Sequence, residues 1–222
     1  HTNLRPLTAL QFHYTTMPVK FDAKALPQKL LPESDRLVLV NGQYQPNLST
    51  VPADVTVMSL MEAADQKMEG LEDYLVTVAD LSETQFKALN SAYLRDGFVL
   101  KVKNNTEITR PIEILFYNIG DDKNPPAIYP RVLYWLGENS HLTLLERHIG
   151  AGTYFTNLYA GVVQEPSSRL QFYKFQEESV GAYHFSFTTL QQQKSAVYEG
   201  FSYATGGRVV RQEQRNLLID SG

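Results

Sequence analysis

The 222-residue sequence contains no cysteine. Without thiols, this stretch of chain supplies no disulfide, no thiolate ligand for zinc or iron–sulfur clusters, and no cysteine nucleophile. Positive charge is also scarce, because 20 Lys and Arg stand against 24 Asp and Glu for a net charge of −4. That balance offers no basic surface for nucleic acid. No apolar run approaches the roughly 18 residues of a transmembrane helix, so we expect neither nucleic-acid nor membrane partners.

The composition is that of an ordinary globular protein, with 43% hydrophobic and 20% charged residues. It excludes a disordered, collagen-like or coiled-coil chain. The length suits one large domain, or one domain with a small appendage. The sequence begins at His1 without Met and ends in a strand-like run, Leu217–Gly222. We therefore expect a piece of a longer protein, and the question of a signal peptide upstream stays open.

Residues 1–96 form a mixed N-terminal segment in which prolines keep the elements short. A proline disfavours helix at the residue before it, and six prolines fall within the first 52 residues. The clearest element is a β-hairpin near residues 36–44. There, Asn41-Gly42 follows a β-rich run and accepts the positive φ angles of a type I′ turn, after which Gln43-Tyr44 returns.

Two helices are expected next, near residues 60–75 and 82–94. In the first, an apolar stripe at helical spacing is formed by Leu60, Ala64, Met68, Leu71 and Leu75. Gly70 weakens the C-terminal part of that helix. The second helix begins with a capping box, in which Ser82 is followed three residues later by Gln85.

From residue 97 onward the sequence predicts a repeating β architecture. Short β-rich runs are separated by polar corners, at residues 104–106, 137–140, 165–168 and 191–195, with a period of roughly 26 to 34 residues. A sandwich of antiparallel hairpins and a stacked solenoid both bury such units. The broad corners favour the solenoid. We predict a mainly β protein, a right-handed parallel β-helix over residues 97–222 preceded by the small α/β segment.

We expect this β-helix core to be incomplete at its C-terminal end. The stacking edge at residues 208–219 would then be exposed, and we expect the chain to self-associate there unless other chain covers it.

The densest set of polar residues that could carry chemistry lies around residues 137–148. A cupin-like metal site would need two His and a Glu on one face of a sheet. Strand alternation places Glu146 and His148 together but turns His141 to the opposite face, and His184 is the one nearby strand candidate for a second ligand. A surface or ladder role is therefore favoured over a metal site.

Other motifs carry no chemistry either. Arg211 and Arg215 share a strand face with Glu213, which neutralises them and leaves no phosphate site. The Gly206-Gly207 pair lacks the strand, glycine-rich turn and helix of a nucleotide site. No column of acidic residues suggests glycan cleavage, and no nucleophile elbow is present. We name no catalytic, cofactor-binding or metal residue, and we expect no enzyme.

Several blocks of this sequence nevertheless resemble the SufB/SufD family of the SUF iron–sulfur cluster assembly machinery, and occur in family order. They are His1–Leu4, Asp35–Tyr44 with Leu48-Ser49, Leu89–Val102, Arg110–Phe116, Pro130–Leu133 with Gly137–Ser140 and Leu144–Glu146, and Gly206-Gly207 with Arg211. The helices ahead of the β region and the absence of cysteine resemble the SufD branch more than SufB.

The resemblance implies a cytoplasmic, non-catalytic scaffold. In the family, SufD pairs with SufB and with the ATPase SufC, and the complex builds a nascent Fe–S cluster; a flavin has also been associated with it. The SufC-docking region and a histidine used in cluster formation lie beyond Gly222 in the family, so neither is assigned here. A homodimer, a SufB-like paralogue, a carbohydrate-active β-helix enzyme and a cupin-like metal protein stay open as alternatives.

Overall fold

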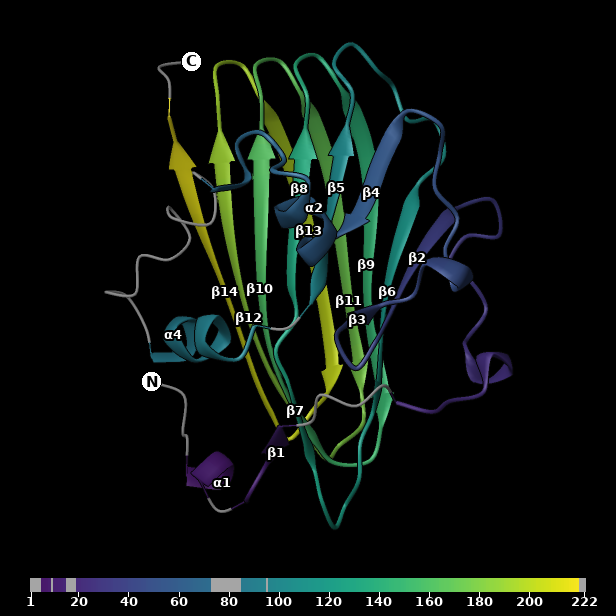
Figure 1. Ribbon diagram of the computed structural model, residues 1–222, viewed down its shortest axis with the longest axis vertical. Helices are drawn as coiled ribbons and strands as arrows, with labels where there is room; N and C mark the ends of the chain where they lie inside the picture. The colour runs from purple at the N-terminus through teal and green to yellow at the C-terminus, as the bar shows by residue number, and fades with distance from the viewer. Residues whose placement is uncertain (1–4, 9, 15–18, 73–84, 95, 220–222) are drawn as a thin grey trace.

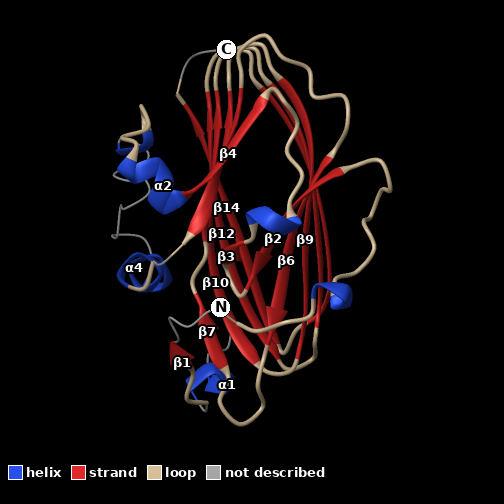
Figure 2. Ribbon diagram, turned by 45° about the vertical axis from the view of Figure 1, so that its right-hand side comes forward, coloured by secondary structure: helices blue, strands red, loops and turns tan. Residues whose placement is uncertain are grey.

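The computed structural model describes residues 5–8, 10–14, 19–72, 85–94 and 96–219. Two β-sheets face each other along the whole molecule (Figures 1 and 2). The strands are β1 His13–Tyr14, β2 Asp35–Val40, β3 Gln43–Tyr44, β4 Val55–Ser59, β5 Gly97–Val102, β6 Ile112–Ile119, β7 Pro126–Ile128, β8 Arg131–Leu136, β9 His141–Ala151, β10 Tyr154–Gln164, β11 Arg169–Glu178, β12 Ala182–Gln192, β13 Val197–Gly206 and β14 Val209–Leu218. The helices are α1 Arg5–Thr8, α2 Leu60–Asp65 and α4 Gln85–Ala92, with 3₁₀ turns at Ala23–Ala25 and Pro46–Leu48.

The two sheets are built by a chain that alternates between them. Sheet A has the order β4-β5-β8-β10-β12-β14, and β7 joins the start of β10 and pairs with β1. Sheet B has the order β3-β2-β6-β9-β11-β13. From β5 onward, each coil passes from one sheet to the other and returns one strand further along, and every pairing between coils is parallel. This is the predicted parallel β-helix, and its corners stack in a row at one end (Figures 1 and 2).

The repeat length varies as the sequence predicts. Gly97 pairs with Arg131, a spacing of 34 residues, and Ile112 pairs with Leu144, a spacing of 32. The later coils settle to 28 residues, as in the pairing of His141 with Arg169. The last described coil shortens to 26. Each coil therefore places its side chains directly above those of the preceding coil.

The polar corners share one backbone conformation. Equivalent positions of successive corners have φ angles between 54° and 59°, at Asn105, Asn139, Ser167 and Ser195. The backbone N–H of each of the first three donates to a carbonyl of the next corner, at 2.8 to 3.0 Å. Asparagine tolerates this left-handed conformation better than most residues with a side chain. A one-residue left-handed bend thus turns the chain into the next sheet.

The space between the sheets holds one hydrophobic core, and the outer face of sheet A holds a second. The first contains Leu39, Leu100 and Ile114, contributed by both sheets. The second lies where α2 and α4 cover sheet A, and it includes Phe155 and Phe185 (Figure 2). Strand β10 is consequently buried on both faces over its whole length.

The N-terminal segment is an integral part of both sheets. Strand β2 pairs in parallel with β6, while β4 pairs antiparallel with β5. The predicted hairpin is confirmed, since β2 and β3 pair antiparallel and Asn41 and Gly42 have φ angles of 45° and 78°. The predicted start of the β region at residue 97 coincides with the first residue of β5.

The helix predicted near residues 60–75 is interrupted in the structure, and its last residues, 73–75, lie outside the described residues. Helix α2 ends at Asp65, because Lys67 and Gly70 adopt φ angles of 51° and 78°. Gly70 lies against the ring of Trp135, where a Cβ would approach within 2.3 Å of a ring carbon. A turn at residues 66–70 therefore interrupts the predicted helix, and Leu71 and Glu72 are again helical. Helix α4 ends at Ala92 instead of near residue 94, and the predicted cap at Ser82 lies outside the described residues.

Among the described residues, no helix is both long and apolar enough to cross a membrane. Strand β14 pairs with β12 and forms the last strand of sheet A in the described ranges. Nearby, Leu218 and Ile219 are exposed. Self-association at this edge stays a prediction.

The corner conformation can be tested at Asn139, an exposed residue. Valine in place of Asn139 should lower the free energy of unfolding by about 1–2 kcal/mol, because a β-branched side chain clashes in the left-handed region. Glycine at the same site also removes the side chain's hydrogen bond to Asn105 but accepts the backbone angles, so it should cost less. Urea denaturation of both variants measures the difference; equal losses would contradict a conformational role.

Candidate functional site

The interior of the solenoid changes from apolar to polar along its length. In sheet B, Ile114 of β6 lies beneath Glu146 of β9, which is followed by Lys174 of β11 and Ser202 of β13. The neighbouring inward column begins at Phe116 of β6. It continues through His148, Gln176 and Ala204. Apolar residues occupy these two columns in β6, and charged or polar residues replace them in β9 and β11. This polar interior is the candidate site.

Glu146 is one centre of the polar interior. Its carboxylate accepts a hydrogen bond from the Tyr134 hydroxyl at 2.9 Å and lies 2.8 Å from Nε2 of His148. The ammonium of Lys174 sits 2.9 Å from the same Oε1 atom and donates to Ser186 of sheet A at 3.2 Å. These contacts cross between the sheets, so they place the carboxylate in the middle of the β-helix.

Glu178 of β11 is the second centre. It accepts hydrogen bonds from the Tyr154 hydroxyl at 3.0 Å and from the Gln176 amide at 2.9 Å. Nδ1 of His184 lies 2.9 Å from Oε2 of Glu178, the oxygen that also accepts from Gln176. The rings of His184 and His148 meet edge to face, with centroids 4.8 Å apart. Two carboxylate–imidazole pairs therefore adjoin inside the protein.

The burial of these groups shifts their protonation. Burial alone would raise the pKa of Glu146, but the Lys174 ammonium and the hydrogen bond from His148 hold that pKa well below its usual range. Burial would likewise raise the pKa of Glu178, and the neighbouring His184 outweighs it to give a pKa of about 2. Burial lowers the pKa of His148 to about 4, against the opposing pull of Glu146. Near neutral pH, both carboxylates are ionised and His148 is neutral.

A cavity of about 360 Å³ adjoins this polar interior at the last described coil. Lys174 and Ser186 line it from β11 and β12, and Tyr198, Gln212 and Gln214 line it from β13 and β14. Because Lys174 also contacts Glu146, the cavity meets the polar cluster at that ammonium.

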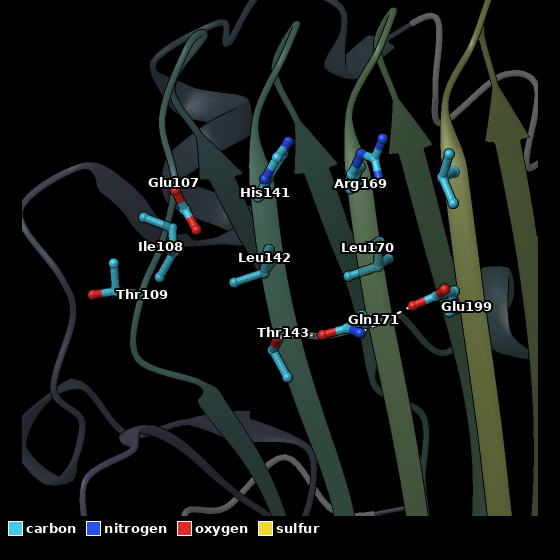
Figure 3. Close-up of a pocket in the computed structure, with 11 residues that line it drawn as sticks. Glu107, Ile108, Thr109, His141, Leu142, Thr143, Arg169, Leu170, Gln171 and Glu199 are labelled. Carbon is cyan, nitrogen blue, oxygen red and sulfur yellow. Dashed lines mark hydrogen bonds between the residues drawn. The ribbon is translucent and has the colours of Figure 1, made fainter.

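The sequence argument on strand parity is confirmed for the histidines. Glu146 and His148 share the inner face and are fully buried, and His141 lies on the outer face of sheet B. There it lines a groove of about 250 Å³ beside Arg169, over β9, β11 and β13 (Figure 3). In the same groove, a polar ladder joins Thr143 to Gln171 and Gln171 to Glu199.

His184 of β12 and His148 of β9 lie in different sheets, but their rings meet across the interior with centroids 4.8 Å apart. Even so, the described ranges hold no group of three or more His, Cys, Asp or Glu side chains arranged to hold a metal ion. The Arg211–Glu213 pair on β14 is present as predicted.

Sequence reasoning missed Lys174, Gln176 and Glu178 as members of this site. A signal existed, because alternate positions of β11 start apolar at Leu170 and Phe172 and then turn polar on the same face. A lysine at an inward position requires a buried anion within reach, and Glu146, one coil earlier, supplies it.

Helix α4 is tied to the outer face of sheet A by a second buried polar network. Oδ1 of Asn90 accepts from the guanidinium of Arg131 at 2.8 and 3.1 Å, and the Asn90 amide donates to the carbonyls of Pro130 and Asn157. The Phe86 ring packs on Phe185 at a centroid distance of 4.6 Å. These contacts fix the helix over β8, β10 and β12.

Two family models match consecutive parts of the chain. One, described as the SufBD protein N-terminal region, covers residues 28–114. The other, described as SUF system FeS cluster assembly, SufBD core domain, covers residues 118–222. The chain belongs to the SufBD family. The N-terminal model matches the residues that place β2 and β4 in the two sheets, and the core model matches the coils that hold the polar interior.

Two curated relatives are similar to the chain. It is 28% identical to the iron-sulfur cluster assembly SufBD family protein slr0076 of Synechocystis, over 95% of the chain and 49% of that protein. It is 27% identical to the chloroplastic protein ABCI7 of Arabidopsis thaliana, over 57% of the chain and 28% of that protein. The chain thus spans about half or less of the length of these relatives.

Replacing Lys174 with Met tests the buried ion pair. Without the ammonium, Glu146 keeps its burial but loses its cation, so the free energy of unfolding should fall by about 3–5 kcal/mol. The matched control is Lys103→Met, whose partner Asp54 is exposed, and it should cost less than about 1 kcal/mol. Chemical denaturation compares the two. Similar losses would show that Lys174 does not neutralise a buried carboxylate.

The lowered pKa of His148 predicts a pH dependence of stability. Between pH 6.5 and about 4, His148 binds a proton in the unfolded chain but stays neutral in the folded protein. Acidification through this range therefore lowers the free energy of unfolding. The neutral ring contributes stability above pH 6.5, and the full loss below about pH 4 amounts to roughly 3 kcal/mol. In His148→Gln it should disappear.

Urea denaturation between pH 7 and about 4, with a chelator to keep metal ions off the imidazole, measures this slope. His141→Gln is the control, since that ring lies in the outer groove, and it should keep the wild-type dependence. A His148→Gln protein with the wild-type slope in this window would refute the assignment.

Proposed function

We propose that this chain acts as a SufD-type scaffold in a cytoplasmic SUF iron–sulfur cluster assembly complex. The observation that carries the proposal is the match of both SufBD family models to consecutive parts of the chain. In this function the chain catalyses no reaction, and it pairs with a SufB-type subunit and the SufC ATPase.

Two features support the SufD branch over SufB. The 222 residues contain no cysteine, so they give no thiolate to a growing cluster. The region before the β-helix core also carries short helices, of which α2 and α4 pack on sheet A. The cluster is then the cargo of the complex. The flavin implied by the family resemblance stays a prediction to which no described residue is assigned.

The stacked fold suits a scaffold that passes motion between subunits. Its coils are joined along two continuous parallel sheets, and the corners are bonded to one another in a row. Such a stack moves as a unit, so a displacement applied at one end by an ATPase would reach the other end. This coupling belongs to the proposal.

The test is a pull-down from lysate of the source organism, with the full-length protein as bait and mass spectrometry as the readout. We expect recovery of a cysteine-containing β-helix protein of the same family together with an ABC-type ATPase. An unrelated parallel β-helix protein serves as the control bait and should recover neither.

The outcomes separate the alternatives. If the ATPase is recovered but no second β-helix protein is, the SufB-like alternative is favoured, with two copies of this chain forming a homodimer in place of the heterodimer. Recovery of neither partner by a bait with a folded circular dichroism spectrum would refute the scaffold function.

A further inference from the structure

Three hydrogen-bond acceptors are left without a partner in the polar interior. Nδ1 of His148, Nε2 of His184 and Oε1 of Gln176 are buried, and none has a hydrogen-bond donor among the described residues. The three side chains are fully inaccessible to solvent. A buried polar atom left unpaired costs about 1–3 kcal/mol. Three on neighbouring residues therefore indicate an occupant that supplies positive charge or donors.

One nitrogen of each ring lies beside a carboxylate. Nε2 of His148 is hydrogen-bonded to Oε1 of Glu146 at 2.8 Å. Nδ1 of His184 lies 2.9 Å from Oε2 of Glu178, a close contact without hydrogen-bond geometry. In a neutral imidazole, the nitrogen that faces a carboxylate holds the proton and the other nitrogen keeps its lone pair. Histidines that bind metals are oriented by this same arrangement, with the second N–H donated to a carboxylate.

Gln176 completes the donor set. It pairs in register with His148 on the adjacent strand, and its amide nitrogen is already committed to Glu178. Its free atom is therefore the carbonyl oxygen. Two imidazole nitrogens with an amide oxygen suit divalent ions of the first transition series, while magnesium and calcium prefer ligand sets made of oxygen alone.

The spacing and charge of the cluster agree with such an ion. Metal–nitrogen bonds of about 2.0–2.1 Å put the centroids of two imidazoles on one ion about 4.5–5 Å apart. The rings of His148 and His184 are 4.8 Å apart. The two carboxylates, Glu146 and Glu178, outnumber the single ammonium of Lys174 in the cluster, which favours a cation over an anion.

A route to the cluster is also present. The cavity at the last described coil is lined by Lys174 and Ser186, and Ser186 is the inward neighbour of His184 on β12. An ion or a water molecule in this cavity is one inward position away from the His184 ring.

We propose that the interior of the β-helix holds a site for a divalent first-row transition metal ion, bound by His148, His184 and Gln176 and completed by water. Glu146 and Glu178 act as positioning residues that orient the imidazoles. The site is independent of the thiolate chemistry of a cluster, since this chain has no cysteine. It also stands apart from the proposed scaffold function, because its test requires no partner.

The test uses Co²⁺ as the probe, with the purified full-length protein. Equilibrium dialysis should give stoichiometric binding, and visible absorption should report nitrogen ligands on the cobalt. His148→Gln and His184→Gln should each weaken binding more than tenfold. Glu178→Gln, which keeps both rings but loses the orienting charge, should weaken it by about 10–100-fold. His141→Gln, in the outer groove, should bind as wild type does.

The same experiment can overturn the proposal. Absence of stoichiometric Co²⁺, or binding that survives both interior histidine substitutions, would leave ordered water as the occupant of the site. Each variant is first checked for the wild-type circular dichroism spectrum. If neither histidine variant folds, X-ray absorption on the wild-type complex decides, because fewer than two imidazole ligands on cobalt would refute the site.

Discussion

The constraint on which this structure depends is the vertical alignment of its coils. A ladder such as His141 with Arg169 and Arg169 with Val197 fixes each residue above its equivalent, and the left-handed corner residues repeat in the same column. Once one coil is in register, a shift by a single residue in the next would turn every inward side chain outward. Inward residues of successive coils therefore stay stacked in the same columns. A substitution at one inward position changes the environment of the residues directly above and below it.

The polar interior follows from this alignment. Glu146 stacks on the apolar Ile114 of the preceding coil, and Lys174 of the following coil stacks on Glu146. A charge pair between stacked coils compensates the cost of burying either charge alone, although an apolar pair would pack there at less cost. Stability alone thus gives no reason for the charged residues in β9 and β11. Their presence at the centre of the fold is consistent with the proposed ion site.

The sequence correctly predicted those elements whose conformation depends on interactions between residues close together in the chain. The Asn41-Gly42 hairpin, the polar corners and the opposite parity of His141 and His148 depend on turn chemistry and strand alternation, and all are present. The helix near residues 60–75 is interrupted after Asp65, where Lys67 and Gly70 take positive φ angles and Gly70 lies against Trp135, a contact that periodicity cannot reveal. The meeting of His148 with His184 was out of reach for the same reason, since it depends on which strands face each other across the core.

The pairing of β2 with β6 has a consequence for the order in which the chain folds. Arg36 on β2 is held by Glu113 on β6, a partner 77 residues later in the sequence. At translation rates of about 5–20 residues per second, the first strand of sheet B waits for roughly 4–15 s before its neighbour exists. During that interval β2 has its parallel neighbour missing and can pair only with β3 in the local hairpin. Parallel pairing in sheet B therefore begins only when β6 has been made, and the later strands of that sheet add to this first pair in chain order.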